Sequence, residues 1–466
     1  MPDPFTEHLQ AYADSLELAD FQGAVLVAKD GRVLMARGFG YRDVERSMRN
    51  SPTTLFDIGS ITKQFTAAAI LKLEMMGRLR VEDTITKYFP EVPADKQRIT
   101  LHHLLRHESG LPGGIGGDYD PIDRRTFTEQ LFKQPLRFPT GTGFGYSNTG
   151  YSLLAMIVED VSGMGYEEFL RTQLFEPAGM STTGYDLQIP QDPIAIGYSC
   201  DEERWGRPTE KPWDGNAPYW HLKGNGGLLS TVEELYAWTL ALDGDAVLDA
   251  TARAKLFEPP LRAEETRDSY YAYGWDVHRT PRGTRSIGHN GSNRIFYSDL
   301  VRLVDEGITV IHSSNRMCQS FHGLTNNLAM LALDSTYVPQ IPIAETKASR
   351  DFTRALIRDA TEHGHAQALR HHAERPAGTN VLEHLVNEAG YDLLGQGGIP
   401  QAIEVFLLNT SLFPNSSNAF DSLGEGYWWL GDNEAAIGAY KRSLELDPGN
   451  GNAEDVILDI KAGRRP

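Results

Sequence analysis

Two pairs of short apolar runs stand at opposite ends of the first 340 residues, and they restrict the folds open to this chain. Residues 24–28 and 33–36 are joined through Asp30-Gly31, a dipeptide that favours the two-residue turn of a β-hairpin. Residues 296–304 and 308–312 are separated by Asp305-Glu306-Gly307, which predicts a second hairpin. Between them, helical patterns alternate with Gly- and Pro-rich loops. We therefore predict an α+β fold, in which one antiparallel sheet flanked by helices is assembled from both ends of the domain and the middle forms a helical lobe.

Two helices are predicted close to the first hairpin. Residues 6–18 have the spacing of a short amphipathic helix. Residues 60–76 are rich in Ala, Leu and Ile and contain neither Gly nor Pro, which predicts a second helix that begins at Ser60.

The character of the sequence changes near residue 340, as expected for a 466-residue chain that exceeds the size of a single core. We predict a domain over 1–340, a linker with a helix (around 350–373) over 341–379, and helical repeats over 380–466. Five pairs of similar residues lie 34 positions apart: Gly390 and Gly424, Gly397 and Gly431, Ala402 and Ala436, Phe406 and Tyr440, Pro414 and Pro448. This period resembles that of tetratricopeptide repeats. Since about three repeats are usually needed for stability, two of them are expected to pack on a neighbouring segment, either as a structural appendage or as a site for a protein partner or for self-association.

Charge and composition exclude several classes of protein. Lys and Arg number 44 against 63 Asp and Glu, giving a formal net charge of −19, which argues against nucleic acid and anionic membrane as main partners. No run approaches the roughly 20 apolar residues of a membrane helix, and the N-terminal residues lack a secretory pattern. We therefore expect a cytoplasmic protein, with a removed leader as the alternative.

No metal or cofactor is expected. Cys200 and Cys318 are far apart in the sequence and form no CxxC pattern, which predicts two free structural thiols. The phosphate-cradling and dinucleotide-binding Gly loops are absent from the sequence. Four histidines near the linker lack the Cys or carboxylate spacing of a metal site and are predicted to lie on a solvated helix face: His363, His365, His371 and His372.

Ser60 and Lys63 form the first candidate catalytic pair. If a helix begins at Ser60, Lys63 lies three residues further on and therefore on the same face. A serine hydroxyl needs a neighbouring base to become a nucleophile, and a lysine of lowered pKa can supply it. The helix N-terminus would also stabilise negative charge on a reacting oxygen. A single Ser-x-x-Lys match is weak, because it is expected by chance about once or twice in such a chain.

Two further elements strengthen this reading. A Gly-rich turn leads into Tyr146-Ser147-Asn148, ahead of a helical pattern. Gly288-His289-Asn290-Gly291-Ser292 directly precedes the late β-run, so His289 and the backbone amide of Ser292 are expected on a strand that faces the start of the Ser60 helix.

The three elements, in this order, resemble the penicillin-recognising serine hydrolases, a family of class C β-lactamases, D-alanyl-D-alanine peptidases, esterases and D-aminopeptidases. The resemblance covers roughly residues 20–335 and includes residues 104–112 and 226–231. It implies the serine β-lactamase/transpeptidase fold. By resemblance, Ser60 is the nucleophile, and Lys63 and Tyr146 form the general base system, with the proton acceptor left open between them. Asn148 would hold Lys63 and the acyl group, and the amides of Ser60 and Ser292 would bind the oxyanion next to Gly291.

His289 is the main departure from the family pattern. It stands where β-lactamases have a lysine that binds the substrate carboxylate, and an ordinary histidine is largely uncharged at neutral pH. Relatives with this histidine include esterases and peptidases, so we predict a hydrolase of small esters, amides or short peptides. The alternatives are a β-lactamase or D-alanyl-D-alanine carboxypeptidase, and a penicillin-binding sensor or repeat-organised binding protein. Arg294 could restore a positive charge, although a surface arginine is the simpler interpretation.

Overall fold

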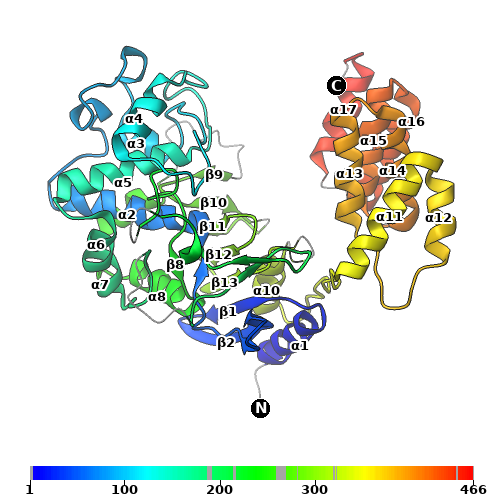
Figure 1. Cartoon of the computed structure of the whole chain (residues 1–466), viewed down its shortest axis with the longest axis horizontal. Helices are drawn as coiled ribbons and strands as arrows, with labels where there is room; N and C mark the ends of the chain where they lie inside the picture. Colours follow the sequence, from blue (N-terminus) through cyan, green and yellow to red (C-terminus); the bar gives the residue numbers. More distant parts are fainter. Residues whose placement is uncertain are drawn as a thin grey trace. The chain divides into compact units, whose positions relative to one another are not determined.

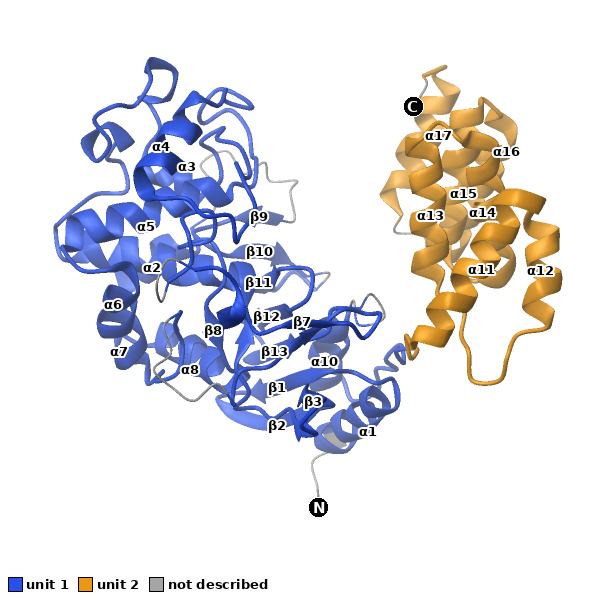
Figure 2. Cartoon of the chain, viewed as in Figure 1, with its two compact units in different colours: residues 1–342 blue, residues 343–466 orange. Residues whose placement is uncertain are grey.

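The computed structural model describes residues 4–185, 192–213, 217–258, 269–280, 282–318, 321, 323–447 and 450–464. They belong to two units, Met1–Pro342 and Ile343–Pro466 (Figure 2). Separate hydrophobic clusters stabilise the two units. None of the helices in the described ranges combines the length and apolarity needed to cross a bilayer.

The first unit is built around an antiparallel sheet (Figure 1). Within the described residues, seven strands follow the order β2-β1-β13-β12-β11-β10-β9. Their bounds are β1 (Gly23–Lys29), β2 (Arg32–Phe39), β9 (Ser269–Tyr271), β10 (Asp276–Arg279), β11 (Arg285–Ser292), β12 (Tyr297–Leu303) and β13 (Ile308–Ser314). Because β1 pairs with β13, the sheet joins both ends of the domain, and the predicted fold class is confirmed.

The first hairpin closes as its turn residues predict. Asp30 has φ +50° and Gly31 has φ +76°, so both central residues of the turn are left-handed. This backbone matches the right-handed twist of the two strands. β1 then pairs with β13 along its whole length, from Gly23 opposite Ser314 to Lys29 opposite Ile308.

Both faces of β1 are buried, which explains its unbroken apolar sequence. Val25 and Val27 belong to a cluster with residues of α1 (Pro4–Leu18) and α10 (Leu324–Leu333). Ala24, Leu26 and Ala28 belong to the larger cluster, which includes residues of α8 (Val232–Asp243) and of the helical lobe. Successive side chains of a strand point to opposite faces, so this one segment joins two layers of helices to the sheet.

The lobe surrounds α2 (Thr62–Met75), which is buried along most of its length, including the polar side chains of Thr62, Lys63, Gln64 and Thr66. The other helices of the lobe and its border are α3 (Leu101–Leu105), α4 (Arg124–Lys133), α5 (Asn148–Ser162), α6 (Tyr166–Leu170), α7 (Glu176–Ala178) and α9 (Ala250–Leu256). Short two-stranded pairs complete the unit: β3 (Tyr41–Asp43) with β4 (Met48–Arg49), β5 (Phe56–Asp57) with β8 (Leu229–Ser230), and β6 (Gly197–Tyr198) with β7 (Arg204–Gly206).

The second unit is helical: α11 (Lys347–His363), α12 (His365–Ala373), α13 (Glu383–Gly395), α14 (Ile399–Leu412), α15 (Ser417–Leu430), α16 (Asn433–Leu446) and α17 (Gly451–Lys461). α13 and α15 begin 34 residues apart, as do α14 and α16. Positions related by this period make the same contact, since a Cβ on Gly390 would collide with the ring of Phe406 and one on Gly424 with the ring of Tyr440. The tetratricopeptide assignment stays a prediction, and Pro448 lies outside the described residues.

The segment predicted as a linker contributes two helices to this unit. Leu356 of α11 and Ala368 of α12 share a cluster with Val386 of α13 and Val405 of α14. Two of the four nearby histidines pair with carboxylates: His365 Nδ1 lies 2.7 Å from Glu404, and His371 Nδ1 lies 2.6 Å from Asp359.

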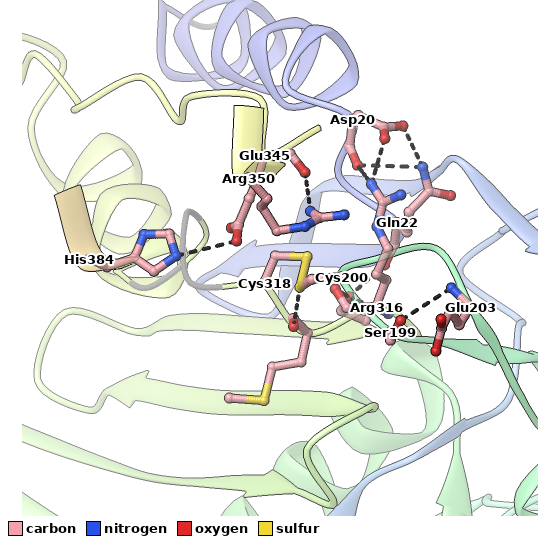
Figure 3. The surroundings of a disulfide bond; sticks show 12 residues. Asp20, Gln22, Ser199, Cys200, Glu203, Arg316, Cys318, Glu345, Arg350 and His384 are labelled. Atoms are coloured by element: carbon pink, nitrogen blue, oxygen red, sulfur yellow. Dashed lines mark hydrogen bonds and ion pairs between the residues drawn. A yellow bond between two sulfur atoms is a disulfide. The ribbon is translucent and has the colours of Figure 1, made fainter. Parts of the chain in front are cut away.

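The prediction of two free thiols is wrong, because Cys200 and Cys318 form a disulfide (Figure 3). The end of β6 and the segment after β13 are hydrogen-bonded to each other, since the amide of Tyr198 donates to the carbonyl of Asn315 at 2.9 Å. The two Cα atoms therefore lie 5.7 Å apart although 118 positions separate them. Distance along the chain gave no information on distance in space. Next to the disulfide, Arg316 pairs with Asp20 (Figure 3).

We expect the disulfide to contribute to stability, because it closes a loop of 118 positions. Chain-entropy arguments give about 5 kcal/mol for a loop of that length. A Cys200→Ser/Cys318→Ser variant should therefore melt at a lower temperature than the oxidised protein, measured by calorimetry. Thiol titration of the denatured, unreduced protein should find no free thiol, and two free thiols would contradict the pairing.

Candidate active site

Ser60 lies in a single 3₁₀ turn, Gly59–Ile61, immediately before α2. Gly59 has φ +49°, a left-handed conformation that glycine adopts without strain. The turn sets Ser60 at the start of the helix, and its side chain remains half-buried while its neighbours are buried. The hydroxyl is therefore held in place and still reachable from outside.

Lys63 is fully buried one turn along from Ser60. Its Nζ atom lies 2.9 Å from Ser60 Oγ and donates a hydrogen bond of 2.7 Å to the carbonyl of Asn225. Burial lowers the pKa of Lys63 well below its ordinary value, and the negative charge of Asp118 opposes this shift. An amine held against a hydroxyl in this way is suited to accept its proton.

Tyr146 contacts both Ser60 and Lys63. Lys63 Nζ lies 4.7 Å from the centre of the Tyr146 ring, and Tyr146 is hydrogen-bonded to Ser60. Burial raises the pKa of Tyr146, so its phenol stays protonated at neutral pH. The hydroxyl of Ser60 is thus in contact with both an amine and a phenol, and burial favours the neutral form of each.

Asn148 is placed by the start of α5. Ser147 caps that helix by accepting the Gly150 amide, and the Asn148 amide donates to the Gly113 carbonyl at 2.9 Å. The side-chain Oδ1 of Asn148 is buried and has no hydrogen-bond partner among the described residues. The predicted bond from this oxygen to Lys63 is therefore not formed, and the Asn225 carbonyl receives the lysine instead.

Strand β11 passes directly beside the Ser60 turn. A Cβ on Gly291 would lie 2.0 Å from the Ile58 oxygen and 2.5 Å from the Ser60 nitrogen. A Cβ on Gly59 would lie 2.5 Å from the Ser292 nitrogen. Glycine is thus required on both sides of this contact, which brings the amides of Ser60 and Ser292 to the same place. Two converging backbone N–H groups are the usual means of stabilising an oxyanion.

His289 is buried on β11 and hydrogen-bonded on both sides of its ring. Nδ1 donates to the Asn290 carbonyl, so Nε2 is an acceptor, and the Tyr271 hydroxyl donates to it at 3.0 Å. Burial, together with the charge of Lys63, lowers the pKa of His289 to about 3. The imidazole is therefore neutral, and it places no cation at this position. Arg294 is exposed. Burial, the larger effect, raises the pKa of Asp118, whereas the charge of Arg294 lowers it.

His107, which lies within the family-like stretch 104–112, also belongs to the site. Its buried ring lies 4.3 Å from the Tyr146 ring and 4.5 Å from the Tyr271 ring, and Nδ1 accepts the Ser147 amide at 3.1 Å. Burial lowers the pKa of His107 well below its ordinary value. The ring of His107 is therefore neutral, and it packs against the rings of Tyr146 and Tyr271.

Three other residues of the site were not selected from the sequence: Asp57, Asp118 and Asn225. Asn225 precedes the stretch 226–231 and Asp57 precedes Ser60 by three positions, so proximity to a motif was the available signal. Asp118 carries no such signal, because it lies in a loop whose path is set by tertiary contacts.

Several known proteins resemble this chain in sequence and in fold. The family model described as Beta-lactamase matches residues 14–333. Penicillin-binding protein 4* of Bacillus subtilis is 32% identical over 327 residues, covering 66% of this chain and 72% of the relative. The octameric penicillin-binding protein homologue from Pyrococcus abyssi has a TM-score of 0.57 at 27% identity and covers 78% of this chain and 83% of that one. D-amino acid amidase from Ochrobactrum anthropi has a TM-score of 0.59 at 22% identity, covering 72% and 99%, and shows a shared fold.

The lowered pKa of His289 predicts a loss of stability in acid. The unfolded histidine titrates near 6.5 and the folded one near 3, so between these values the unfolded state binds more protons. The contribution is complete above pH 6.5 and is lost as the pH falls, by about 3 kcal/mol at pH 4. A His289→Gln variant should therefore lose less melting temperature between pH 7 and pH 4 than the unmodified protein.

The matched control is His278→Gln, which removes an exposed histidine from the neighbouring strand β10. It should leave the acid-induced shift unchanged. Equal shifts in all three proteins would mean that His289 is charged in the folded state.

Proposed function

Because the chain belongs to the β-lactamase family, whose members are serine hydrolases of amide, ester or β-lactam bonds, we propose that it forms an acyl-enzyme on Ser60 and hydrolyses small esters or amides. Short peptides and D-amino-acid peptides are included in this substrate class. The observation that carries the proposal is the buried amine of Lys63, 2.9 Å from the Ser60 hydroxyl.

The opposite shifts of Lys63 and Tyr146 favour one assignment of roles. The pKa of the amine is lowered and that of the phenol is raised, so at neutral pH the first is a proton acceptor and the second a proton donor. Lys63 takes the proton of Ser60 as Oγ bonds to the substrate carbonyl carbon. Tyr146 then gives its proton to the leaving group as the bond to that group breaks, and recovers a proton from Lys63.

The amides of Ser60 and Ser292 stabilise the oxyanion formed by this attack. Water then attacks the acyl-enzyme with the same groups in reversed roles, the hydroxyl of Ser60 is restored, and the acid product leaves. Gly291 has no side chain to fill the space between the two amides.

Two side chains support the choice of substrate. His289 is neutral, so a substrate carboxylate finds no fixed charge at this position. Asn148 Oδ1 is a buried acceptor that has no partner among the described residues, which suits an acyl group that carries an N–H. Together they favour acylated amino compounds and esters over substrates recognised by a carboxylate.

A β-lactamase or D-alanyl-D-alanine carboxypeptidase is the second candidate. It is favoured by the 32% identity to a relative named as a penicillin-binding protein. A penicillin-binding sensor would form the same acyl adduct without turnover. We further propose that the helical unit serves for protein binding or self-association. The cytoplasmic location remains our prediction, and the disulfide argues against it, because disulfides persist mainly in oxidising compartments.

Side-by-side hydrolysis of a short-chain nitrophenyl ester and a chromogenic cephalosporin tests the proposal. We expect ester turnover, little cephalosporin turnover, and loss of ester turnover by at least about a thousandfold in Ser60→Ala. Activity that survives Ser60→Ala would show that the nucleophile is another group. Fast cephalosporin turnover would make the second candidate the function, and a stable adduct without turnover would indicate a sensor.

A cation at position 289 should shift the substrate preference. In His289→Lys we expect cephalosporin turnover to rise about tenfold, because a charge-assisted hydrogen bond to the carboxylate contributes on the order of 1.5 kcal/mol. His278→Lys, which adds the same charge at an exposed position, is the control. A folded His289→Lys protein with unchanged cephalosporin kinetics would show that charge at this position does not limit the reaction.

A further inference from the structure

The carboxylate of Asp57 connects the two chain segments that carry the proposed oxyanion donors. Oδ1 accepts the backbone N–H of Gly59 at 2.8 Å, one residue before Ser60. Oδ2 accepts the side-chain N–H of Asn293 at 2.8 Å, one residue after Ser292. Each oxygen of one carboxylate therefore binds a residue adjacent to one of the two donors.

Asn293 is in turn fixed to the chain that follows β11. Its Oδ1 accepts the amides of Ile295 at 3.0 Å and Phe296 at 2.8 Å. The side chain thus has a defined orientation, with its oxygen toward these amides and its nitrogen toward Asp57. A rotation of the amide group would break three hydrogen bonds.

The segments joined by Asp57 meet through glycines. Gly59 and Gly291 pack backbone against backbone, and they have no side chains that could interdigitate and fix their spacing. Asp57 is itself held by backbone pairing. It lies in β5, which pairs with β8, and the amide of the next residue, Ile58, donates to the Leu228 carbonyl at 2.9 Å. The bridge therefore links the Ser60 turn and the end of β11 to one rigid support.

This bridge has a cost in stability. Burial raises the pKa of Asp57 to about 7, and the charge of Asp118 adds to the shift, although the bonds from Gly59 and Asn293 lower it. The folded pKa lies above the unfolded value near 3.9, so stability is lost as the pH rises through this range. An asparagine at position 57 would avoid this cost but would offer one acceptor and one donor, and its donor would face the donor of Asn293.

We propose that Asp57 is a positioning residue for the reaction, which sets the spacing of the Ser60 and Ser292 amides by bridging Gly59 and Asn293. The proposal rests on the proposed function, because it assigns those two amides to the oxyanion. Asp57 does not touch the substrate in this role. It acts through the two backbone segments, and it affects the stability of the transition state and not the binding of substrate.

Reciprocal substitution tests the bridge on the full-length protein. Asp57→Asn should lower kcat for the nitrophenyl ester by about tenfold or more with little change in KM, because displaced oxyanion donors affect the transition state and not substrate binding. Asn293→Ala should cause a similar loss, and combining it with Asp57→Asn should add little to either single loss. In Asp57→Asn/Asn293→Asp the donor and acceptor are exchanged, so the bond forms again and kcat should recover to within about threefold of the unmodified enzyme.

The control is Asp43→Asn, which makes the same substitution at another buried carboxylate that accepts a backbone amide, that of Arg46, away from the site. It should retain full activity. The proposal is overturned if Asp57→Asn keeps the unmodified kcat, or if the exchanged pair, folded by its melting temperature, is no more active than Asp57→Asn alone.

Failure of the proposed function gives a different result. In that case the unmodified protein shows no turnover that depends on Ser60, whatever residue stands at position 57. The rate at which a fluorophosphonate probe labels Ser60 then replaces kcat, since its phosphoryl oxygen needs the same two amides. The labelling rates are expected to follow the order given for kcat: lowered in Asp57→Asn, in Asn293→Ala and in their combination, and recovered in Asp57→Asn/Asn293→Asp.

Discussion

The antiparallel pairing of β1 with β13 is the constraint on which the first unit depends. It closes one sheet from the two ends of the domain, with seven residue pairs from Gly23 opposite Ser314 to Lys29 opposite Ile308. β12 and β11 follow β13 in the sheet, so this ladder also determines where β11 lies. The helical lobe is inserted between the two ends, and its first helix therefore begins beside β11. The contact between Gly59 and Gly291 is the consequence.

Exclusion of water unites the chemistry of the site. Lys63, Tyr146 and His289 have different ionisable groups, but burial is the largest cause of the pKa shift of each. In every case it favours the neutral form. One physical condition therefore produces an amine that accepts a proton, a phenol that donates one, and an imidazole that carries no charge. The buried ring of His107, which packs against Tyr146, also helps to exclude water from the site.

The end of β11 is held by more than one set of contacts. Asn293 binds Asp57 on one side. On the other, the hydroxyl of Ser292 donates to Met317 Sδ at 3.0 Å, and the Met317 amide donates to the Ile295 carbonyl at 2.9 Å. Met317 precedes Cys318, so the disulfide anchors the segment that contacts Ser292. Stability of the fold and placement of the oxyanion donors thus rely on neighbouring residues.

Sequence alone determined the features that depend on local pattern. Asp30-Gly31 specifies its turn by backbone conformation, the unbroken apolar run of β1 indicates a strand buried on both faces, and the 34-residue period locates the helices of the second unit. The serine and lysine of the site could also be identified from the sequence, because a spacing of three positions along a helix brings two side chains together.

Tertiary structure alone decided the contacts between distant segments. The sequence did not reveal the Cys200–Cys318 bond, the Asn225 carbonyl that receives Lys63, or the bridge from Asp57 to Asn293. Each joins residues more than a hundred positions apart, and no local periodicity records which segments the sheet brings together. The pKa shifts belong to the same class, because the type of residue sets only their direction, whereas their occurrence depends on how much water the folded chain excludes.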